Sequence, residues 1–111
     1  MGASKTEQFT EQQNRTAALL KALAHPARIA IVQHLLKAQS CICGELVNEL
    51  PLAQPTISQH LKELKHAGIV QSRTIGTTVC YCLREESIRE LYDFLDQIVA
   101  SFHHQKAIHC Q

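Results

Sequence analysis

The sequence predicts a mostly α-helical domain with one small β-hairpin. Apolar residues recur at helical spacing over most of the chain, alternate with polar ones only within residues 69–83, and are punctuated by glycine and proline between these segments. The chain has 111 residues, which suits one domain. Trp is absent and aromatic residues make up 5%, so the core has to be built from Leu, Ile, Val and Ala. Such a core is thin, which makes dimerisation attractive as additional burial.

The first two predicted helices are marked by local start signals. Residues 10–13 have the pattern of a capping box, which predicts a helix from there to about Ala24. Its apolar residues on one face are Ala17, Leu20, Leu23 and Ala24. Pro26 suits the first turn of a second helix that ends near Ala38. That helix carries Ile29, Val32, Leu35 and Leu36 at helical spacing.

The middle of the chain predicts two further helices joined by a tight turn. Residues 40–42 are short and β-prone, residues 44–50 have a helical pattern, and residues 51–53 form the turn. The next helix begins at Gln54 and Pro55 and continues to Ala67, with Gly68 well placed as its C-terminal cap.

Residues 69–83 predict a hairpin around Gly76, and a last helix follows it. The alternation directs Val79, Tyr81 and Leu83 inward, which sends Cys80 and Cys82 outward. Residues 87–90 form a second capping-box pattern ahead of the last helix. One apolar stripe runs along that helix through Ile88, Leu91, Tyr92, Leu95, Ile98, Val99 and Phe102.

Two short helices, a tight turn and a following hairpin make a winged helix-turn-helix. The domain is expected to span residues 10–104, between a flexible N-terminal tail, 1–9, and a C-terminal tail, 105–111. No later element covers the stripe of the last helix. We therefore expect a homodimer that associates through the first and last helices.

Charge and motifs narrow the class of function. Residues 54–84 hold four Lys or Arg against one acid, whereas residues 85–96 hold five acids against Arg89. This split fits a polyanion-binding middle and an acidic last helix. No glycine-rich phosphate loop, nucleophile elbow or metallohydrolase helix is present, so neither an enzyme nor an organic cofactor is expected. With neither a membrane-span pattern nor a signal peptide, a cytoplasmic protein without a membrane partner is expected.

Four segments together resemble the ArsR/SmtB repressors, the arsenical- and metal-responsive winged-helix dimers. They are residues 23–28 (LAHPAR), 54–64 (QPTISQHLKEL), 67–70 (AGIV) and the hairpin end 81–83 (YCL). The resemblance covers roughly residues 15–103. It implies a homodimer that represses from operator DNA and leaves when an inducer binds. The arsenic and cadmium sensors of that family usually place Cys-x-Cys directly before Asp/Glu-Leu, whereas here Gly44 intervenes after Cys43.

The predicted helix 54–67 carries the candidate DNA-reading residues. Ile57, Leu61 and Leu64 define its buried face, and polar residues point away from that face. Gln bonds adenine edges, Ser and Thr bond bases or phosphates, and Lys neutralises phosphate. His60, near the buried face, is expected to pack or orient the helix. The predicted contacts to double-stranded DNA are Gln54, Thr56, Ser58, Gln59, Lys62 and, on the hairpin, Arg73.

Five cysteines predict sulfur chemistry. An odd number without a signal peptide argues against a secreted disulfide framework, and Cys41-x-Cys43 and Cys80-x-Cys82 are spaced so that each pair shares one face of an extended strand. Thiolates suit soft ions. Cys41 and Cys43 are the predicted inducer ligands, with Cys80, Cys82 or Cys110 as further candidates. The other interpretation of Cys41 and Cys43 is a small buried apolar pair.

The sequence thus predicts a cytoplasmic repressor that a thiophilic metal or metalloid releases from operator DNA. As(III) is favoured, and Cd(II) and Zn(II) are the other candidate ions. Two alternatives remain open at this point. One is a thiol redox repressor that forms a disulfide, and the other is a dimeric interaction or zinc-binding module that does not bind DNA.

Overall fold

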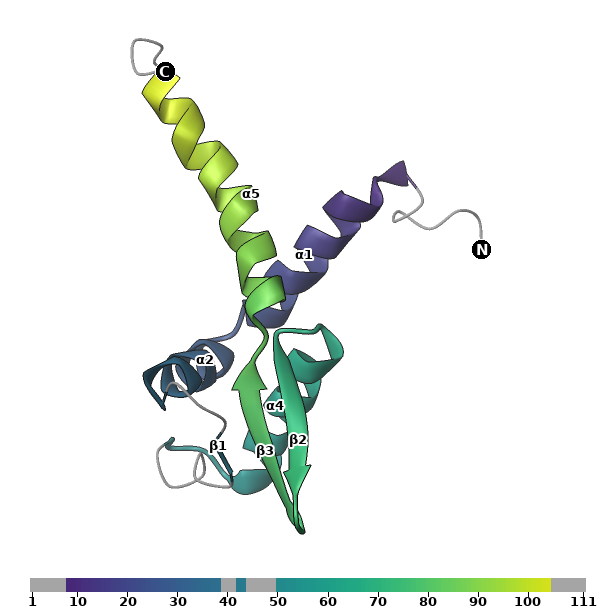
Figure 1. Ribbon diagram of the computed structural model, residues 1–111, viewed down its shortest axis with the longest axis vertical. Coiled ribbons are helices and arrows are strands. Elements are labelled where there is room, and N and C mark those ends of the chain that lie inside the picture. Colours follow the sequence, from purple (N-terminus) through teal and green to yellow (C-terminus); the bar gives the residue numbers. More distant parts are fainter. Residues whose placement is uncertain (1–7, 39–41, 44–49, 105–111) are drawn as a thin grey trace.

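A computed structural model describes residues 8–38, 42–43 and 50–104 (Figure 1). The predicted helix 44–50 therefore lies almost entirely outside the described residues. The elements in chain order are α1 (Glu11–Leu23), α2 (Pro26–Ala38), β1 (Ile42–Cys43), α4 (Gln54–His66), β2 (Val70–Ile75), β3 (Thr78–Leu83) and α5 (Glu85–His104). This order confirms the mostly helical fold with a small hairpin.

Local signals set several of these boundaries. The Thr10 hydroxyl accepts from the Gln13 backbone N–H and the Gln13 side chain accepts from the Thr10 N–H, each at 3.0 Å, so the predicted capping box begins α1. Gly68 follows α4 with a φ of 85°, and Gly76 makes the hairpin turn with a φ of 63°. Both values lie in the left-handed region that favours glycine.

The three strands form one antiparallel sheet in the order β1-β3-β2. The short strand β1 pairs with β3, as a winged helix requires, and β2 and β3 form the wing. In Figure 1 the wing extends to one end of the molecule, while α1 and α5 diverge at the other. The core lies between these parts and includes Leu19, Ile31, Leu35, Ile57, Leu61, Leu64, Ile69, Val70 and Leu91.

The first two helices bury faces that match the predicted ones only in part, since Leu23, Val32 and Leu35 meet the core as predicted. In α1 the buried residues are Thr16, Leu19 and Ala22, while Leu20 is exposed and lines a groove with Phe94 of α5. In α2 the buried residues are Ile31 and Leu35. Both helices are apolar on more than one side, so their sequence pattern does not fix which side meets the core.

Two predictions in the C-terminal half were wrong. Ser87 does not cap α5, which begins two residues earlier at Glu85; its hydroxyl is fully buried and donates to the Gly68 carbonyl instead. The hairpin alternation was right for Tyr81 and Leu83, which pack against the core, but wrong for the two residues before them, because Cys80 has no exposed area whereas Val79 is 43% exposed. Val79 lies toward the wing tip, beyond the reach of the core, while Cys80 lies in the middle strand between Cys43 and Arg73.

The predicted stripe of α5 is mostly uncovered in the single chain. Leu91 is buried and Ile88 packs on the core, but the remaining five apolar side chains of the stripe are each 43–63% exposed: Tyr92, Leu95, Ile98, Val99 and Phe102. Across the described ranges, no helix combines the length and the apolarity that a membrane span needs.

Candidate nucleic-acid interface

Helix α4 has one apolar and one polar face. Ile57, Leu61 and Leu64 are buried against the core, as the helical spacing predicted. The polar residues proposed to read DNA are all exposed: Gln54, Thr56, Ser58, Gln59 and Lys62. One hydrogen bond crosses this surface, from Gln59 Nε2 to Glu63 Oε2 at 3.0 Å. An exposed contact of this kind is weak, so Gln59 can exchange Glu63 for a base edge at low cost.

The wing supplies one further cation beside this surface. Arg73 lies on β2 with an exposed side chain, opposite Cys80 of β3. The hairpin extends from the body of the molecule alongside α4 (Figure 1). In a winged helix this arrangement places a wing cation where a phosphate backbone passes.

A polar cluster ties α4 to α2 behind the polar face. Arg28 Nε donates to His60 Nδ1 at 3.1 Å, and Arg28 Nη1 donates to the Ala22 carbonyl at 3.1 Å. The His25 and His60 rings lie with their centroids 4.5 Å apart. Burial lowers the pKa of His60 from 6.5, and the neighbouring His25 and Arg28 lower it further. The predicted orienting role of His60 fits this position, but the partnership with Arg28 had no signal in the sequence.

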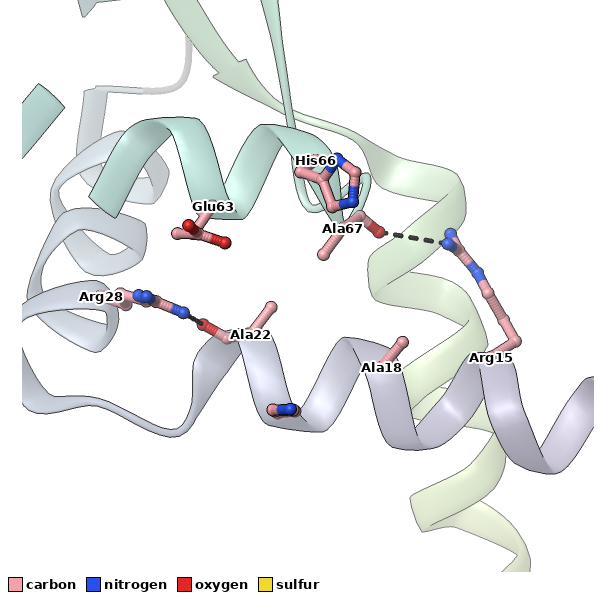
Figure 2. Close-up of a pocket in the computed structure, with 8 residues that line it drawn as sticks. Arg15, Ala18, Ala22, Arg28, Glu63, His66 and Ala67 are labelled. Carbon is pink, nitrogen blue, oxygen red and sulfur yellow. Dashed lines mark hydrogen bonds between the residues drawn. The ribbon is translucent and has the colours of Figure 1, made fainter. Parts of the chain in front are cut away.

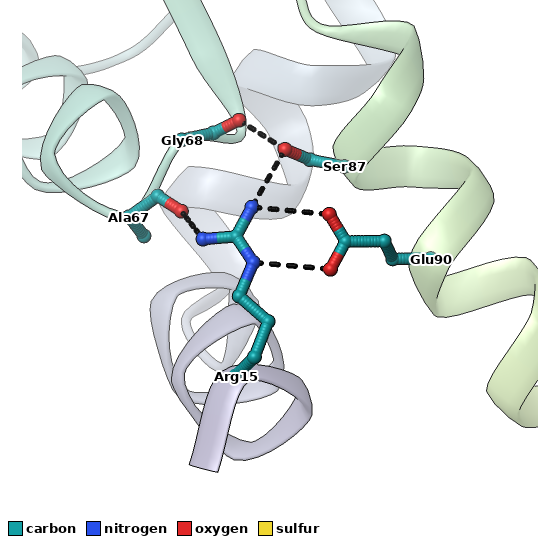
Figure 3. Close-up of polar contacts among 5 residues, drawn as sticks. All are labelled: Arg15, Ala67, Gly68, Ser87 and Glu90. Atoms are coloured by element: carbon teal, nitrogen blue, oxygen red, sulfur yellow. Dashed lines mark hydrogen bonds and ion pairs between the residues drawn. The ribbon is translucent and has the colours of Figure 1, made fainter. Parts of the chain in front are cut away.

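A second cluster joins α1, the end of α4 and α5 through Arg15 (Figure 3). Its guanidinium donates to both carboxylate oxygens of Glu90, at 3.1 and 3.3 Å, and to the Ala67 carbonyl at 3.1 Å. It also donates to the Ser87 hydroxyl at 3.1 Å, which in turn donates to the Gly68 carbonyl. Sequence reasoning missed this cluster, because its members are up to 75 residues apart.

Both arginines border a pocket of about 460 Å³ between α1 and α4 (Figure 2). Its charged lining residues are Arg15, Lys21 and Arg28 against Glu63. The two guanidinium groups already bind protein carbonyls at its walls, as Figure 2 shows. The pocket therefore separates the two polar clusters that hold α4.

The β1–β3 register places one cysteine of the first Cys-x-Cys segment beside one cysteine of the second. Cys43 lies directly opposite Cys80, and Ile42 lies opposite Tyr81. Cys80 is disulfide-bonded, whereas Cys82 is a free thiol whose sulfur lies 3.6 Å from Gln71 Nε2. Cys41 and Cys110 are outside the described residues. Within the described part of the chain, no three His, Cys, Asp or Glu side chains gather as a metal site would require.

Comparison with known proteins places the fold and the segment around α4 in one family. The profile of bacterial regulatory proteins of the arsR family matches residues 25–72. The SmtB transcriptional repressor of Mycobacterium tuberculosis is 47% identical over 66% of this chain, which spans only 53% of that protein. An uncharacterised transcriptional regulator of Methanocaldococcus jannaschii, MJ1325, is 36% identical over 79% of this chain and 99% of its own.

A solved structure is similar over nearly the whole length. The homodimeric winged helix-turn-helix DNA-binding domain of Mb0332 from Mycobacterium bovis is 28% identical, with a TM-score of 0.65. The alignment covers 99% of this chain and 98% of that one. These relatives are regulators rather than enzymes. Together with the winged helix-turn-helix architecture, they show that this chain belongs to the arsR family of bacterial regulatory proteins.

Proposed function

We propose that this protein is a cytoplasmic repressor that binds double-stranded operator DNA as a homodimer. The observation that carries the proposal is the exposed polar face of α4. Buried apolar residues and the two polar clusters around Arg28 and Arg15 hold this helix against the rest of the domain. In this arrangement α4 enters the major groove. There Gln54, Thr56, Ser58 and Gln59 meet bases or phosphates, Lys62 neutralises a phosphate, and Arg73 meets the backbone beside the groove.

The homodimer is supported by the uncovered stripe of α5 and by the similar Mycobacterium bovis domain, which is homodimeric. Two copies covering each other's α1 and α5 would bury the exposed apolar side chains of both. A two-fold dimer presents two α4 helices, so the operator should be an inverted repeat with its half-sites one helical turn apart.

The inducer in this proposal is a thiophilic metal or metalloid ion, with As(III) favoured over Cd(II) and Zn(II). Cys41 and Cys43 are its main ligands, and Cys80, Cys82 or Cys110 completes the site. The register of Cys43 opposite Cys80 supports this, because it brings one cysteine of each pair onto adjacent strands. Thiolates bind such soft ions strongly, and the site must be reduced to do so. Ion binding would favour a conformation with low DNA affinity.

The disulfide of Cys80 favours a second candidate, a thiol redox repressor. In this scheme two thiols form a disulfide and pass two electrons and two protons to an oxidant such as oxidised glutathione, which leaves as two thiols. The oxidant acts on strand β3, where Cys80 lies opposite Arg73 of the wing, whereas the main ligands of the ion are Cys41 and Cys43. The two schemes differ in whether a reduced protein responds without an oxidant.

The test begins with a duplex that the reduced wild-type protein selects from a random-sequence pool. Binding to this duplex is then measured while As(III), Cd(II), Zn(II) or oxidised glutathione is added. The proposal expects release by As(III) under reducing conditions and loss of that release in Cys41→Ser and Cys43→Ser, both of which still bind DNA. Cys110→Ser weakens release only if the tail supplies a ligand.

The other outcomes distinguish the alternatives. Release by the oxidant alone, abolished in Cys80→Ser, supports the redox repressor. Unchanged As(III) release in the Cys41/Cys43 double serine variant moves the site to Cys80 and Cys82. A reduced protein that selects no duplex at all contradicts the repressor and leaves the interaction module.

A further inference from the structure

The cluster of His25, Arg28 and His60 lies outside both the cysteine pairs and the predicted DNA contacts. We propose that Arg28 and His60 are positioning residues that hold α4 against α2 only while His60 is neutral, so that proton uptake loosens α4 and weakens DNA binding. The DNA readout of this inference rests on the proposed function, whereas its stability readout does not.

The hydrogen-bond pattern fixes the protonation state of the cluster. A guanidinium has donors but no acceptor, so Arg28 donates and His60 Nδ1 must accept at 3.1 Å with a lone pair. His25 Nδ1 likewise accepts, from the Ala27 backbone N–H at 3.0 Å in the first turn of α2. Both rings therefore use Nδ1 as an acceptor, which a protonated imidazole does not have.

Protonation of His60 places a hydrogen on Nδ1 facing the Arg28 donor. The hydrogen bond is lost, and two cations then face each other beside a second histidine ring 4.5 Å away. The other charged or titratable groups around Arg28 are Lys21 and Arg15 of α1 and Glu63 and His66 of α4, which line the same pocket. Glu63 is the single acid of this set and already accepts from Gln59, so a proton on His60 meets mostly positive neighbours.

The direction in which DNA affinity changes with pH distinguishes this inference from a simple effect of charge. A protein that binds DNA only through charge gains affinity as its histidines become protonated, because each new cation attracts phosphate. Loss of the Arg28–His60 contact acts in the opposite direction, since α4 is then fixed on this side by apolar contacts alone. We expect wild-type affinity to fall as pH drops, by up to tenfold per pH unit for each chain bound, the slope of one proton.

The test compares wild type with His60→Asn, His60→Ala and His34→Asn at constant ionic strength between pH 7.5 and pH 5.5. The probe is the duplex selected by wild type at pH 7.5. Asn keeps an acceptor near the Nδ1 position but does not titrate, so His60→Asn should still bind DNA at pH 7.5. Its affinity should depend less on pH than that of wild type, by up to one proton for each chain bound. His60→Ala should bind more weakly throughout. His34→Asn removes a histidine of α2 outside the cluster and should keep the wild-type slope.

Wild-type affinity that is unchanged or tighter at pH 5.5 overturns the inference, as does a His60→Asn slope equal to that of wild type. Urea unfolding gives a readout that needs no DNA. Because the pKa of His60 is lowered in the folded chain, the unfolded chain binds more protons, and the unfolding free energy falls as pH drops through 6.5. His60→Asn should reduce that fall, and an identical pH dependence in both proteins would contradict the role of His60. Selection of no duplex at pH 7.5 contradicts the proposed function alone. The unfolding comparison still tests whether the Arg28–His60 contact depends on a neutral His60.

Discussion

Single residues of α4 are expected to make two kinds of DNA contact, some with base edges and others with phosphates. Exposed side chains with hydrogen-bonding groups flank Gln59, and Lys62 adds an exposed positive charge three residues further along the helix. A base contact changes which sequence is preferred, whereas a phosphate contact changes affinity for all sequences. The two kinds of contact therefore separate in measurements on single variants.

Gln59→Ala should relax the base preference at one position of each half-site, and Lys62→Ala should weaken binding to every duplex. Because Lys62 is expected to neutralise one phosphate, its loss should reduce the salt slope of log K by about one unit per chain. Titrations at several salt concentrations, with matched and mismatched duplexes, measure both effects. Lys37→Ala, an exposed change on α2, serves as the charge-matched control. If neither α4 variant differs from this control, α4 is not the reading helix.

Ser87 is the residue whose loss should harm the fold most among the polar clusters. It is fully buried, accepts from Arg15 and donates to the Gly68 carbonyl. Ser87→Ala leaves both partners with an unmet hydrogen bond and should lower the unfolding free energy by about 1–3 kcal/mol. Urea denaturation measures this, with the exposed neighbour change Glu86→Ala as control. Equal stability of the two variants would show that the cluster contributes nothing.

Gly68 tests the same junction through the backbone. Its φ of 85° disfavours any side chain, and an added Cβ would lie 3.3 Å from Arg15 Nη2. Gly68→Ala should therefore cost about 1–2 kcal/mol from the left-handed conformation alone. Gly76 also has a positive φ but no atom within 4 Å, so Gly76→Ala isolates the backbone cost from the contact with Arg15.

At the scale of elements, local signals predicted boundaries well and tertiary contacts decided the exceptions. Thr10 and Gly68 mark helix ends through interactions with their own neighbours, which a sequence displays directly. Ser87 has the same local pattern as a cap, but its hydroxyl binds a carbonyl 19 residues away. The burial of Cys80 likewise depends on its place in the middle strand, which periodicity within one hairpin does not specify.

The candidate site was predictable to a similar extent. The spacing of Ile57, Leu61 and Leu64 located the buried face of α4 and hence its exposed polar side. Arg28 meets His60 across 32 residues and Arg15 meets Glu90 across 75, so no local pattern marks these two clusters. The sequence displays both Cys-x-Cys pairs, but the position of Cys43 opposite Cys80 follows only from the strand register.

The exposed stripe of α5 predicts how two copies associate. Leu95 is half-exposed in the single chain, so Leu95→Asp should leave the fold intact. In a dimer it would bury an unpaired carboxylate and cost about 3 kcal/mol or more, which is over a hundredfold in the dissociation constant. Sedimentation measures the shift, with Asp93→Asn on the exposed side of α5 as control. Wild type that stays monomeric at micromolar concentration would remove the dimer.

At the scale of the whole molecule, the fold places its two proposed interfaces at different ends. The diverging helices α1 and α5 carry the apolar surface, and α4 with the wing carries the polar one (Figure 1). Dimerisation through the first end would therefore leave both copies of α4 free to meet one duplex. Cys43 and Cys80 lie on the sheet that includes the wing, and the Arg28–His60 contact joins α2 to α4, so a chemical change at either place can alter the DNA-binding end.

The most direct test of this account is selection of duplexes from a random pool by the reduced wild-type protein at pH 7.5, followed by sequencing and by sedimentation of the complex. The account predicts an enriched inverted repeat, with half-sites about one helical turn apart and two chains bound to each duplex. Enrichment of no sequence, or of a single half-site bound by one chain, would contradict a dimer that reads DNA through α4.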